Sequence, residues 1–231
     1  MIARRVAAVR ERIARAAARA GRAPDDITLI AVSKTQPAET VREAFGAGLR
    51  HFGENKVQEA EDKIAALSDL RAAGLVWHMI GHVQSNKGRR AAEIFDAVDS
   101  VDDATLAKRL ERGAEAAGKQ LPVLVQVDLG KEATKFGLDE AHLFPTLEQL
   151  RGYKAVHVEG LMVLPPLAED PEAARPYFRR LRELLEEARR QRLVRGSALS
   201  MGMSHDFEVA IEEGATHVRV GTALFGERQR P

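Results

Sequence analysis

A lysine stands directly after one of the most apolar segments of the chain. Lys34 follows the run LIAVS, which has the composition of a buried β-strand. The sequence has only nine lysines, and the others fall in polar segments, where solvation is the default, or, like Lys154, ahead of a predicted strand. Aliphatic neighbours favour the neutral amine of a lysine, and a neutral amine attacks an aldehyde to form a Schiff base. The position therefore predicts a covalent anchor or, alternatively, an ion pair with Asp128, Glu54 or Glu159.

Small and hydroxyl-bearing residues follow the last two predicted strands. Residues 200–204 read SMGMS, and Gly221 and Thr222 precede a short helical run over 223–225. Small residues let backbone N–H groups approach a ligand, and a helix start adds partial positive charge. A flexible turn and an ordinary helix cap are the alternatives. Taken together, the two segments predict an anion site, because the last two loops of (β/α)₈ barrels commonly bind phosphate.

Arg219 lies within the last strand rather than after it. In THVRVGT, Val218 and Val220 alternate with Arg219, so the valines are expected to face the helices and the arginine the barrel interior. A buried guanidinium needs an acceptor. The acceptor is either a carboxylate from another strand or an atom of a ligand, such as a ring nitrogen.

The remaining polar residues are less specific. Asn55 follows the second strand and either contacts a ligand or caps the next helix. His78 and His82 are four residues apart on a strand and its loop, but no third ligand with a pattern completes a zinc site, so we expect no metal. Asp128 and Lys135 bracket the loop after the fifth strand. Cysteine is absent, which excludes disulfides, thiolate catalysis and cysteine metal sites.

The elements that must position these residues alternate along the chain. Eight β-branched segments predict strands, at 27–33, 49–53, 76–81, 95–100, 122–129, 156–164, 197–202 and 216–222. Helices are expected between them, at 38–47, 56–67, 85–94, 102–117, 139–150, 171–192 and 206–213, with Asp102 and Asp139 as N-caps and Gly48, Gly118 and Gly214 at helix ends. This pattern predicts one α/β domain over residues 1–231, a (β/α)₈ TIM barrel; a doubly wound open sheet is the alternative.

Composition limits the classes of partner. Net charge is +1 over 231 residues, so nothing drives binding to nucleic acid or to a membrane surface, and no apolar run approaches a membrane span. The Arg-rich amino terminus resembles a mitochondrial transit peptide. However, Ile2, Val6, Val9 and Ile13 recur at helical spacing, which favours an extra amphipathic helix packed on the barrel. A cytoplasmic location fits the lack of cysteine.

Several segments together resemble one known family. LIAVSKTQPAE, HFGENKVQEA, WHMIGHVQSNK, VEGLMVLPP and LSMGMSHDFEVAIEEGATHVRVGTALFGER are similar to the YggS/PROSC family of pyridoxal phosphate homeostasis proteins, relatives of the alanine racemase N-terminal barrel. The resemblance implies a fold-type III barrel that holds pyridoxal 5′-phosphate as a Schiff base on Lys34, with Arg219 at the pyridine nitrogen. Asp128 departs from the family, which usually has asparagine there, and leaves the contacts of its loop open. The expected cofactor-binding residues are Lys34, Asn55, Ser200, Met201, Arg219, Gly221 and Thr222.

The same resemblance bears on whether the protein is an enzyme. Racemization needs a proton-transfer group on each face of the substrate, and alanine racemases take the second, a tyrosine, from a separate domain. We expect that domain to be missing, and neither Tyr153 nor Tyr177 is placed to replace it. The expected function is therefore intracellular storage, shielding or delivery of the cofactor without catalytic residues, by a monomer or weak dimer that contacts pyridoxal-dependent apoenzymes transiently. A weak amino-acid racemase and a sugar-phosphate enzyme whose Lys34 attacks a ketone are the alternatives.

Overall fold

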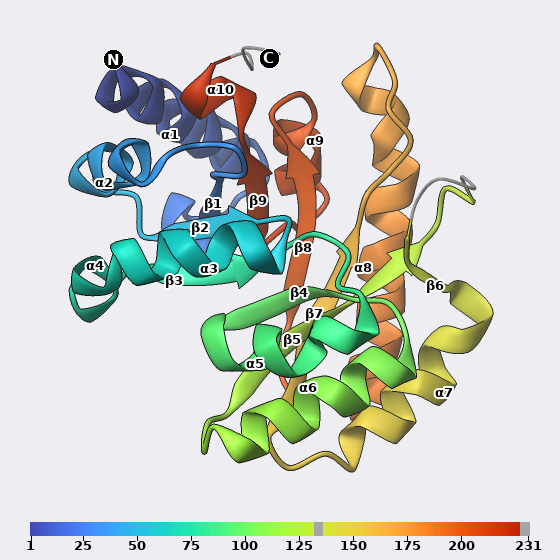
Figure 1. Ribbon diagram of the computed structural model, residues 1–231. Coiled ribbons are helices and arrows are strands. Elements are labelled where there is room, and N and C mark those ends of the chain that lie inside the picture. Colours follow the sequence, from blue (N-terminus) through green and yellow to red (C-terminus); the bar gives the residue numbers. More distant parts are fainter. Residues whose placement is uncertain (132–135, 227–231) are drawn as a thin grey trace.

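The structure, a computed structural model, describes residues 1–131 and 136–226. Within them, eight strands form the wall of a barrel (Figure 1). These strands are β1 (Thr28–Val32), β2 (His51–Glu54), β3 (Val76–Met79), β4 (Ala97–Val101), β5 (Leu121–Asp128), β7 (Val156–Val163), β8 (Ala198–Met203) and β9 (His217–Val220). All eight predicted strands are confirmed. A ninth, β6 (Leu138–Asp139), has two residues that pair with the end of β5, and the sequence did not predict it.

The strands close into a ring. They run in the order β4-β3-β2-β1-β9-β8-β7-β5, all pairs are parallel, and β4 also pairs with β5. In the register of β1, Ile30 lies between His51 of β2 and Arg219 of β9. The closed ring confirms the (β/α)₈ barrel, and the doubly wound open sheet is wrong. Because parallel strands end at one rim, the residues that follow β1, β2, β3, β8 and β9 meet there.

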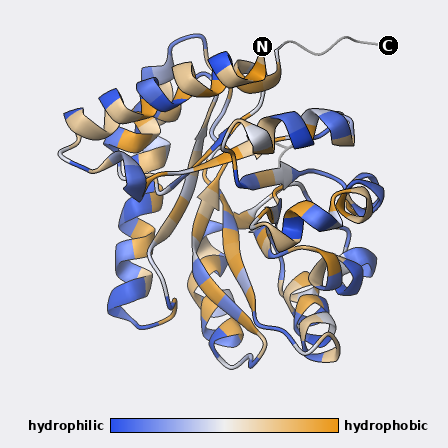
Figure 2. Ribbon diagram, turned by 90° about the vertical axis from the view of Figure 1, so that its left-hand side faces the viewer, coloured by the Kyte–Doolittle hydropathy of each residue, from blue (hydrophilic) through white to orange (hydrophobic). Residues whose placement is uncertain are grey.

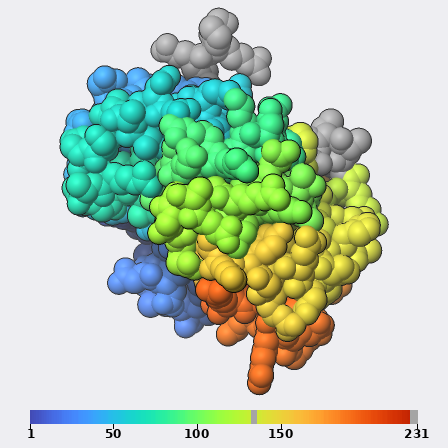
Figure 3. Space-filling view, turned by 60° about the horizontal axis from the view of Figure 1, so that its bottom comes forward, coloured from blue at the N-terminus to red at the C-terminus, as the bar shows by residue number. Residues whose placement is uncertain are grey.

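Helices surround the barrel. The space-filling view of Figure 3 passes from cyan through green and yellow to orange as they follow in chain order. The predicted helices correspond to α2 (Ala38–Gly46), α3 (Val57–Ala66), α5 (Gly88–Ile94), α6 (Ala104–Ala116), α7 (Glu140–Arg151), α8 (Arg175–Arg190) and α9 (Phe207–Glu212). Short 3₁₀ turns, η2 (Ser85–Lys87) and η3 (Pro171–Ala174), precede α5 and α8, and η1 (Pro24–Asp26) precedes β1. The short helical run at the end is α10 (Thr222–Phe225), and the sequence did not predict α4 (Ser68–Ala72).

Helix ends follow the predicted chemistry with one exception. Asp139 caps α7 by accepting the backbone N–H of Ala141, and Gly48, Gly118 and Gly214 have positive φ after their helices. Asp102 is not the cap of α6, and that prediction is wrong. Asp103 accepts the backbone N–H of Leu106 instead, which leaves the carboxylate of Asp102 available for another partner.

The amino-terminal segment forms the expected helix α1 (Ile2–Arg19). Its residues Ile2, Val6, Val9 and Ile13 are buried in the core, and it packs against α9 and α10. Figure 2 shows the result, since apolar residues concentrate on the barrel strands and polar residues on the outer faces of the helices. Among the described helices, none combines the length and the apolar character that crossing a membrane requires.

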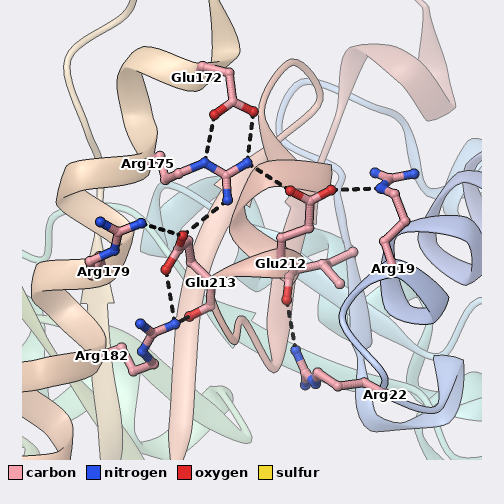
Figure 4. Close-up of polar contacts among 9 residues, drawn as sticks. Arg19, Arg22, Glu172, Arg175, Arg179, Arg182, Glu212 and Glu213 are labelled. Atoms are coloured by element: carbon pink, nitrogen blue, oxygen red, sulfur yellow. Dashed lines mark hydrogen bonds and ion pairs between the residues drawn. The ribbon is translucent and has the colours of Figure 1, made fainter.

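A cluster of arginines and glutamates joins α1, η3, α8 and the end of α9 (Figure 4). At its centre, Glu213 has a side chain only 7% exposed and forms ion pairs with Arg175, Arg179 and Arg182. Burial alone would raise the pKa of Glu213, but the three guanidinium groups outweigh it and lower that pKa. Glu212 extends the cluster to Arg19 of α1 at 2.7 Å. The amino-terminal helix is thus tied by charge to the helices that flank β8 and β9.

Candidate functional site

Lys34 lies just beyond the carboxyl end of β1, and its side chain is partly buried. Together with Val32 it lines a small cleft whose other wall is formed by Gly221, Thr222 and Phe225, at the end of β9 and in α10. These segments meet because β1 and β9 are neighbours in the barrel. The structure therefore brings the predicted anchor lysine and one of the two predicted phosphate loops to the same point of the rim.

The backbone before Lys34 is held by a buried ion pair. Nζ of Lys63, in α3, donates hydrogen bonds to the carbonyl oxygen of Ser33 at 2.9 Å and to Oε1 of Glu54 at 2.7 Å. The hydroxyl of Ser33 donates to the same carboxylate oxygen at 2.6 Å. The carbonyl oxygen and the hydroxyl of the residue that precedes Lys34 are thus both hydrogen-bonded. We call Ser33, Glu54 and Lys63 the anchor-support cluster.

This cluster corrects one sequence-based expectation. Lys63 was expected to be solvated, but its side chain is only 6% exposed. Burial raises the pKa of Glu54, while Lys63 and Ser33 oppose the shift. Glu54, one of the alternative partners considered for Lys34, is instead engaged by Lys63. On the other side of Lys34, Thr35 adopts a left-handed φ of +65° and donates its backbone N–H to Glu59 of α3.

Arg219 points into the barrel as predicted and is only 3% exposed. It donates one hydrogen bond to Oγ of Ser200 at 2.7 Å and another to the carbonyl oxygen of Val163 at 2.9 Å. Burial lowers the pKa of Arg219 to about 10, against the opposing effect of Asp99 and Asp206. The guanidinium therefore keeps its positive charge at neutral pH. Its hydrogen-bond acceptors within the described residues are a hydroxyl and a carbonyl, not a carboxylate.

The loop after β8 reaches the start of α10. Oγ of Ser204 accepts the backbone N–H groups of Gly221 at 3.2 Å and Ala223 at 3.5 Å. These long hydrogen bonds use the donors that an anion would use at a helix start, so the hydroxyl oxygen stands where an anion oxygen would be held. The sequence places Ser204 in the segment 200–204 predicted as part of an anion site, although Ser204 is not among the residues expected to bind the cofactor.

The two residues predicted on β8 face different ways. Ser200 is buried inside the barrel as the partner of Arg219, and Met201 is fully buried in the hydrophobic core, so only its backbone can approach a ligand. Gly202 follows with φ of +90°, and a Cβ there would lie 2.6 Å from Cβ of Ala210 and 2.8 Å from Cα of Phe207. Glycine at this position lets the loop pack closely on α9.

Asn55 lies at the rim between β2 and α3 and is partly exposed. The N-cap of α3 is Lys56, so the alternative interpretation of Asn55 as the helix cap is wrong. The loop after β3 packs directly on it, because a Cβ on Gly81 would lie 2.4 Å from the carbonyl oxygen of Asn55. Asn55 is therefore held at the mouth by a backbone contact and not by a capping role.

Comparison with known proteins agrees with this geometry. Residues 5–229 match the model of the family described as alanine racemase, N-terminal domain. A protein of Aquifex aeolicus is 46% identical over 97% of both chains, and one of Pseudomonas aeruginosa is 47% identical over 98% of this chain and 96% of its own; both are named pyridoxal phosphate homeostasis protein. The chain belongs to this family. The resemblance inferred from its motifs is confirmed.

Solved structures of a similar protein and of more distant ones share the fold. PipY of Synechococcus elongatus, solved with pyridoxal phosphate bound, has a TM-score of 0.86 and 43% identity, and covers 98% of this chain and 100% of its own. Without the cofactor, PipY has a TM-score of 0.88 and 44% identity. An alanine racemase of Corynebacterium glutamicum, at 21% identity and a TM-score of 0.66, covers 96% of this chain and 62% of its own. At that identity the likeness extends to the fold alone.

The two histidines considered for a metal site, His78 in β3 and His82 after it, have different partners. His78 points inside the barrel, where Nδ1 is 3.1 Å from Asp99 and Nε2 is 3.0 Å from His51. His82 lies at the rim, and its Nδ1 is 2.6 Å from Asp102. Among the described residues, no group of three or more histidine, aspartate or glutamate side chains is arranged to hold a metal ion. The sequence did not predict that His82 pairs with Asp102, and this hydrogen-bonded pair lies at the same mouth of the barrel as Lys34.

The other residues considered from the sequence lie away from the cleft or beyond the described residues. The carboxylate of Asp128 accepts the backbone N–H of Lys131 at 2.9 Å, while Lys135 lies outside the described residues. Tyr153 precedes β7, near the amino-terminal rim, and Tyr177 lies in α8. Tyr153 is thus at the rim opposite to Lys34, and Tyr177 is in a helix, as the sequence predicted.

Proposed function

We propose that this protein holds pyridoxal 5′-phosphate through a reversible Schiff base on Lys34 and serves to store, shield and deliver the cofactor. The observation that carries the proposal is the convergence of Lys34 with Gly221 and Thr222 at one cleft, with the buried Arg219 two residues before Gly221 in the chain. PipY, a family member with 43% identity, binds pyridoxal phosphate.

The residues present fit the cofactor. The hydroxyl oxygen of Ser204, which is neutral, accepts hydrogen bonds from the backbone N–H groups of Gly221 and Ala223. A phosphate oxygen would use the same two donors. Asn55 follows β2 at the same rim, and Arg219 supplies a positive charge inside the barrel. When bound, the cofactor supplies an aldehyde that forms a reversible bond to an amine. Lys34 would anchor the group, the loops after β8 and β9 would hold its phosphate, and Arg219 and Asn55 would bind its ring.

The anchor is tested by borohydride reduction followed by intact-mass measurement. The wild-type protein incubated with pyridoxal phosphate is expected to gain the mass of one reduced adduct, and Lys34→Ala is expected to lose it. Lys154→Ala is the matched control, because Lys154 lies at the opposite end of the barrel, ahead of β7. An adduct of unchanged yield in Lys34→Ala would remove the central assignment. A colourless wild-type protein without an adduct would instead favour a sugar-phosphate enzyme.

Delivery without turnover is a separate part of the proposal. The homologous proteins are named for homeostasis, and Tyr153 precedes β7 at the rim opposite to Lys34, while Tyr177 lies in α8 outside the barrel wall. We therefore expect the cofactor-loaded protein to leave L-alanine and D-alanine without measurable inversion. Inversion at about 1 per second or faster, an ordinary enzyme rate, would contradict this and support the weak-racemase alternative. The cytoplasmic location and the transient contact with apoenzymes stay predictions.

A further inference from the structure

A histidine and an aspartate form a hydrogen-bonded pair on the mouth of the barrel. His82 follows β3 and Asp102 follows β4, and Nδ1 of the imidazole is 2.6 Å from Oδ2 of the carboxylate. The Asp102 side chain is only 6% exposed, whereas that of His82 is 30% exposed. Burial raises the pKa of Asp102, and His82 opposes that shift. A nearly buried carboxylate therefore orients an imidazole that remains open to the mouth.

The plane of the His82 ring is also fixed. The ring of Phe136 stacks on it with centroids 3.6 Å apart and planes 8° from parallel. The backbone of Phe136 is held in turn, because the buried side chain of Gln126 donates a hydrogen bond to its carbonyl oxygen. Three consecutive strand ends, those of β3, β4 and β5, thus build one assembly. A histidine on the solvated surface does not usually have both a stacked aromatic ring and a buried carboxylate as partners.

The hydrogen bond to Asp102 decides which nitrogen can react. A carboxylate accepts the proton of Nδ1, so the lone pair of the neutral imidazole lies on Nε2. Within residues 1–131 and 136–226, Asp102 is the only hydrogen-bond partner of the His82 ring. An imidazole whose Nδ1 is held by a carboxylate and whose Nε2 is open has the arrangement of a general base.

The position of His82 connects it to the cofactor site. The preceding residue, Gly81, packs on the backbone of Asn55 and accepts a hydrogen bond from the buried hydroxyl of Ser100 at 2.6 Å. Asn55 is one of the residues that would face the cofactor. In the ring of strands, β3 and β4 stand on the other side of β1 from β8 and β9, whose loops would hold the phosphate. His82 therefore stands at the same mouth, on the side of β1 away from the loops that would hold the phosphate, and this is where we place the incoming amine.

We propose that His82, oriented by Asp102, transfers protons during exchange of the cofactor between Lys34 and an incoming primary amine. The inference rests on the proposed function. An amine arrives protonated at neutral pH, and Nε2 of His82 takes that proton. The neutral amine then forms the new carbon–nitrogen double bond, its two N–H protons pass to the nitrogen of Lys34, and the double bond to that nitrogen breaks. His82 releases its proton to the departing amine of Lys34 through water, so no proton is consumed.

Two probes separate this role from a structural one. Ethylamine is protonated at neutral pH and needs a base, whereas methoxyamine is largely neutral and does not. Stopped-flow absorbance follows the exchange of each probe with the loaded protein. In His82→Gln and His82→Asn, we expect exchange with ethylamine to be slowed by about 100-fold, the lower range for general base catalysis, and exchange with methoxyamine to be nearly unchanged. For Asp102→Asn we expect slowing by about 10-fold with ethylamine only.

The control is His142→Gln, the same substitution at an exposed position of α7, which is expected to leave both rates unchanged. A readout without the cofactor is the ¹⁵N spectrum of the His82 ring in the apo protein, where Nδ1 should carry the proton and should lose that preference in Asp102→Asn. Equal slowing with both probes, or slowing with neither, would overturn the role of His82. Failure of wild type to form the borohydride adduct would instead remove the proposed function.

Discussion

The anchor-support cluster yields a prediction that the structure makes quantitative. Replacing Lys63 with methionine keeps most of the length of the side chain but removes the charged partner of Glu54, whose side chain is fully buried. Removing one member of a buried ion pair leaves an uncompensated charge and typically costs about 3–5 kcal/mol. We therefore expect Lys63→Met to lower the free energy of unfolding by about 3–5 kcal/mol at pH 8, measured by urea denaturation.

The cost should depend on pH. Without Lys63, burial holds the folded-state pKa of Glu54 further above its value in the unfolded chain. A group with a raised folded-state pKa binds more protons in the folded state, so its contribution to stability is retained at low pH and lost as pH rises. The deficit of Lys63→Met should therefore be smaller at pH 5 than at pH 8.

Two further variants make the measurement decisive. Lys56→Met removes an exposed lysine nearby and should change stability by less than about 0.5 kcal/mol. The double variant Lys63→Met/Glu54→Gln removes both charges but keeps an acceptor for the hydroxyl of Ser33, and should recover at least about 1 kcal/mol relative to Lys63→Met alone. A deficit below about 1 kcal/mol for Lys63→Met at pH 8, or one independent of pH, would refute the reasoning.

Three other predictions concern stability. Gly202→Ala should cost about 2–4 kcal/mol by urea denaturation, because it combines a positive φ with close contacts, whereas Gly21→Ala, with no atom within 4 Å, should cost only about 1–2 kcal/mol. Burial lowers the pKa of His51 and His217 to about 4, below the value of about 6.5 in the unfolded chain, so the unfolded chain binds more protons as pH falls. The free energy of unfolding should therefore fall between pH 7 and pH 4 by about 2 kcal/mol per histidine, a figure already reduced for partial exposure. Replacing either histidine with glutamine should flatten that pH profile. Glu213→Gln should cost about 2 kcal/mol at pH 7, and the difference from wild type should shrink as pH falls through the carboxylate range, because the folded-state pKa of Glu213 is lowered.

The strands and the long helices could be predicted because their patterns are local. β-Branched runs between turn residues mark the eight barrel strands, and the 3.6-residue recurrence of apolar residues marks α1. The strand β6 has two residues and the helix α4 has five, and both are too short to show a periodic pattern of apolar residues. Asp102 and Asp103 both suit a helix start by type, and only the fold decides which one caps α6.

The parts of the site that were missed depend on contacts between distant segments. Lys63 has polar neighbours along α3, so its sequence suggests a solvated helix face, yet the packing of α3 on β2 buries it. His82 and Asp102 are 20 residues apart in the chain. They meet because β3 pairs with β4 and each residue follows the end of its strand. The predicted barrel therefore implies that His82 and Asp102 are neighbours.

The electrostatics of the site distinguish between two uses of a bound aldehyde cofactor. Arg219, with a pKa of about 10, stays protonated at neutral pH and offers a ring nitrogen a hydrogen-bond donor but no acceptor. A ring nitrogen held by such a donor stays unprotonated, which weakens the electron withdrawal that bond breaking at an amino-acid Cα requires. Exchange between amines does not need that withdrawal. It needs a neutral amine, an anchor in a fixed position and a group that moves protons, which Lys34, the anchor-support cluster and the His82–Asp102 pair can provide. The charge of Arg219 therefore favours exchange between amines over reactions that depend on strong electron withdrawal at Cα, and the proposed proton transfer by His82 would serve that exchange.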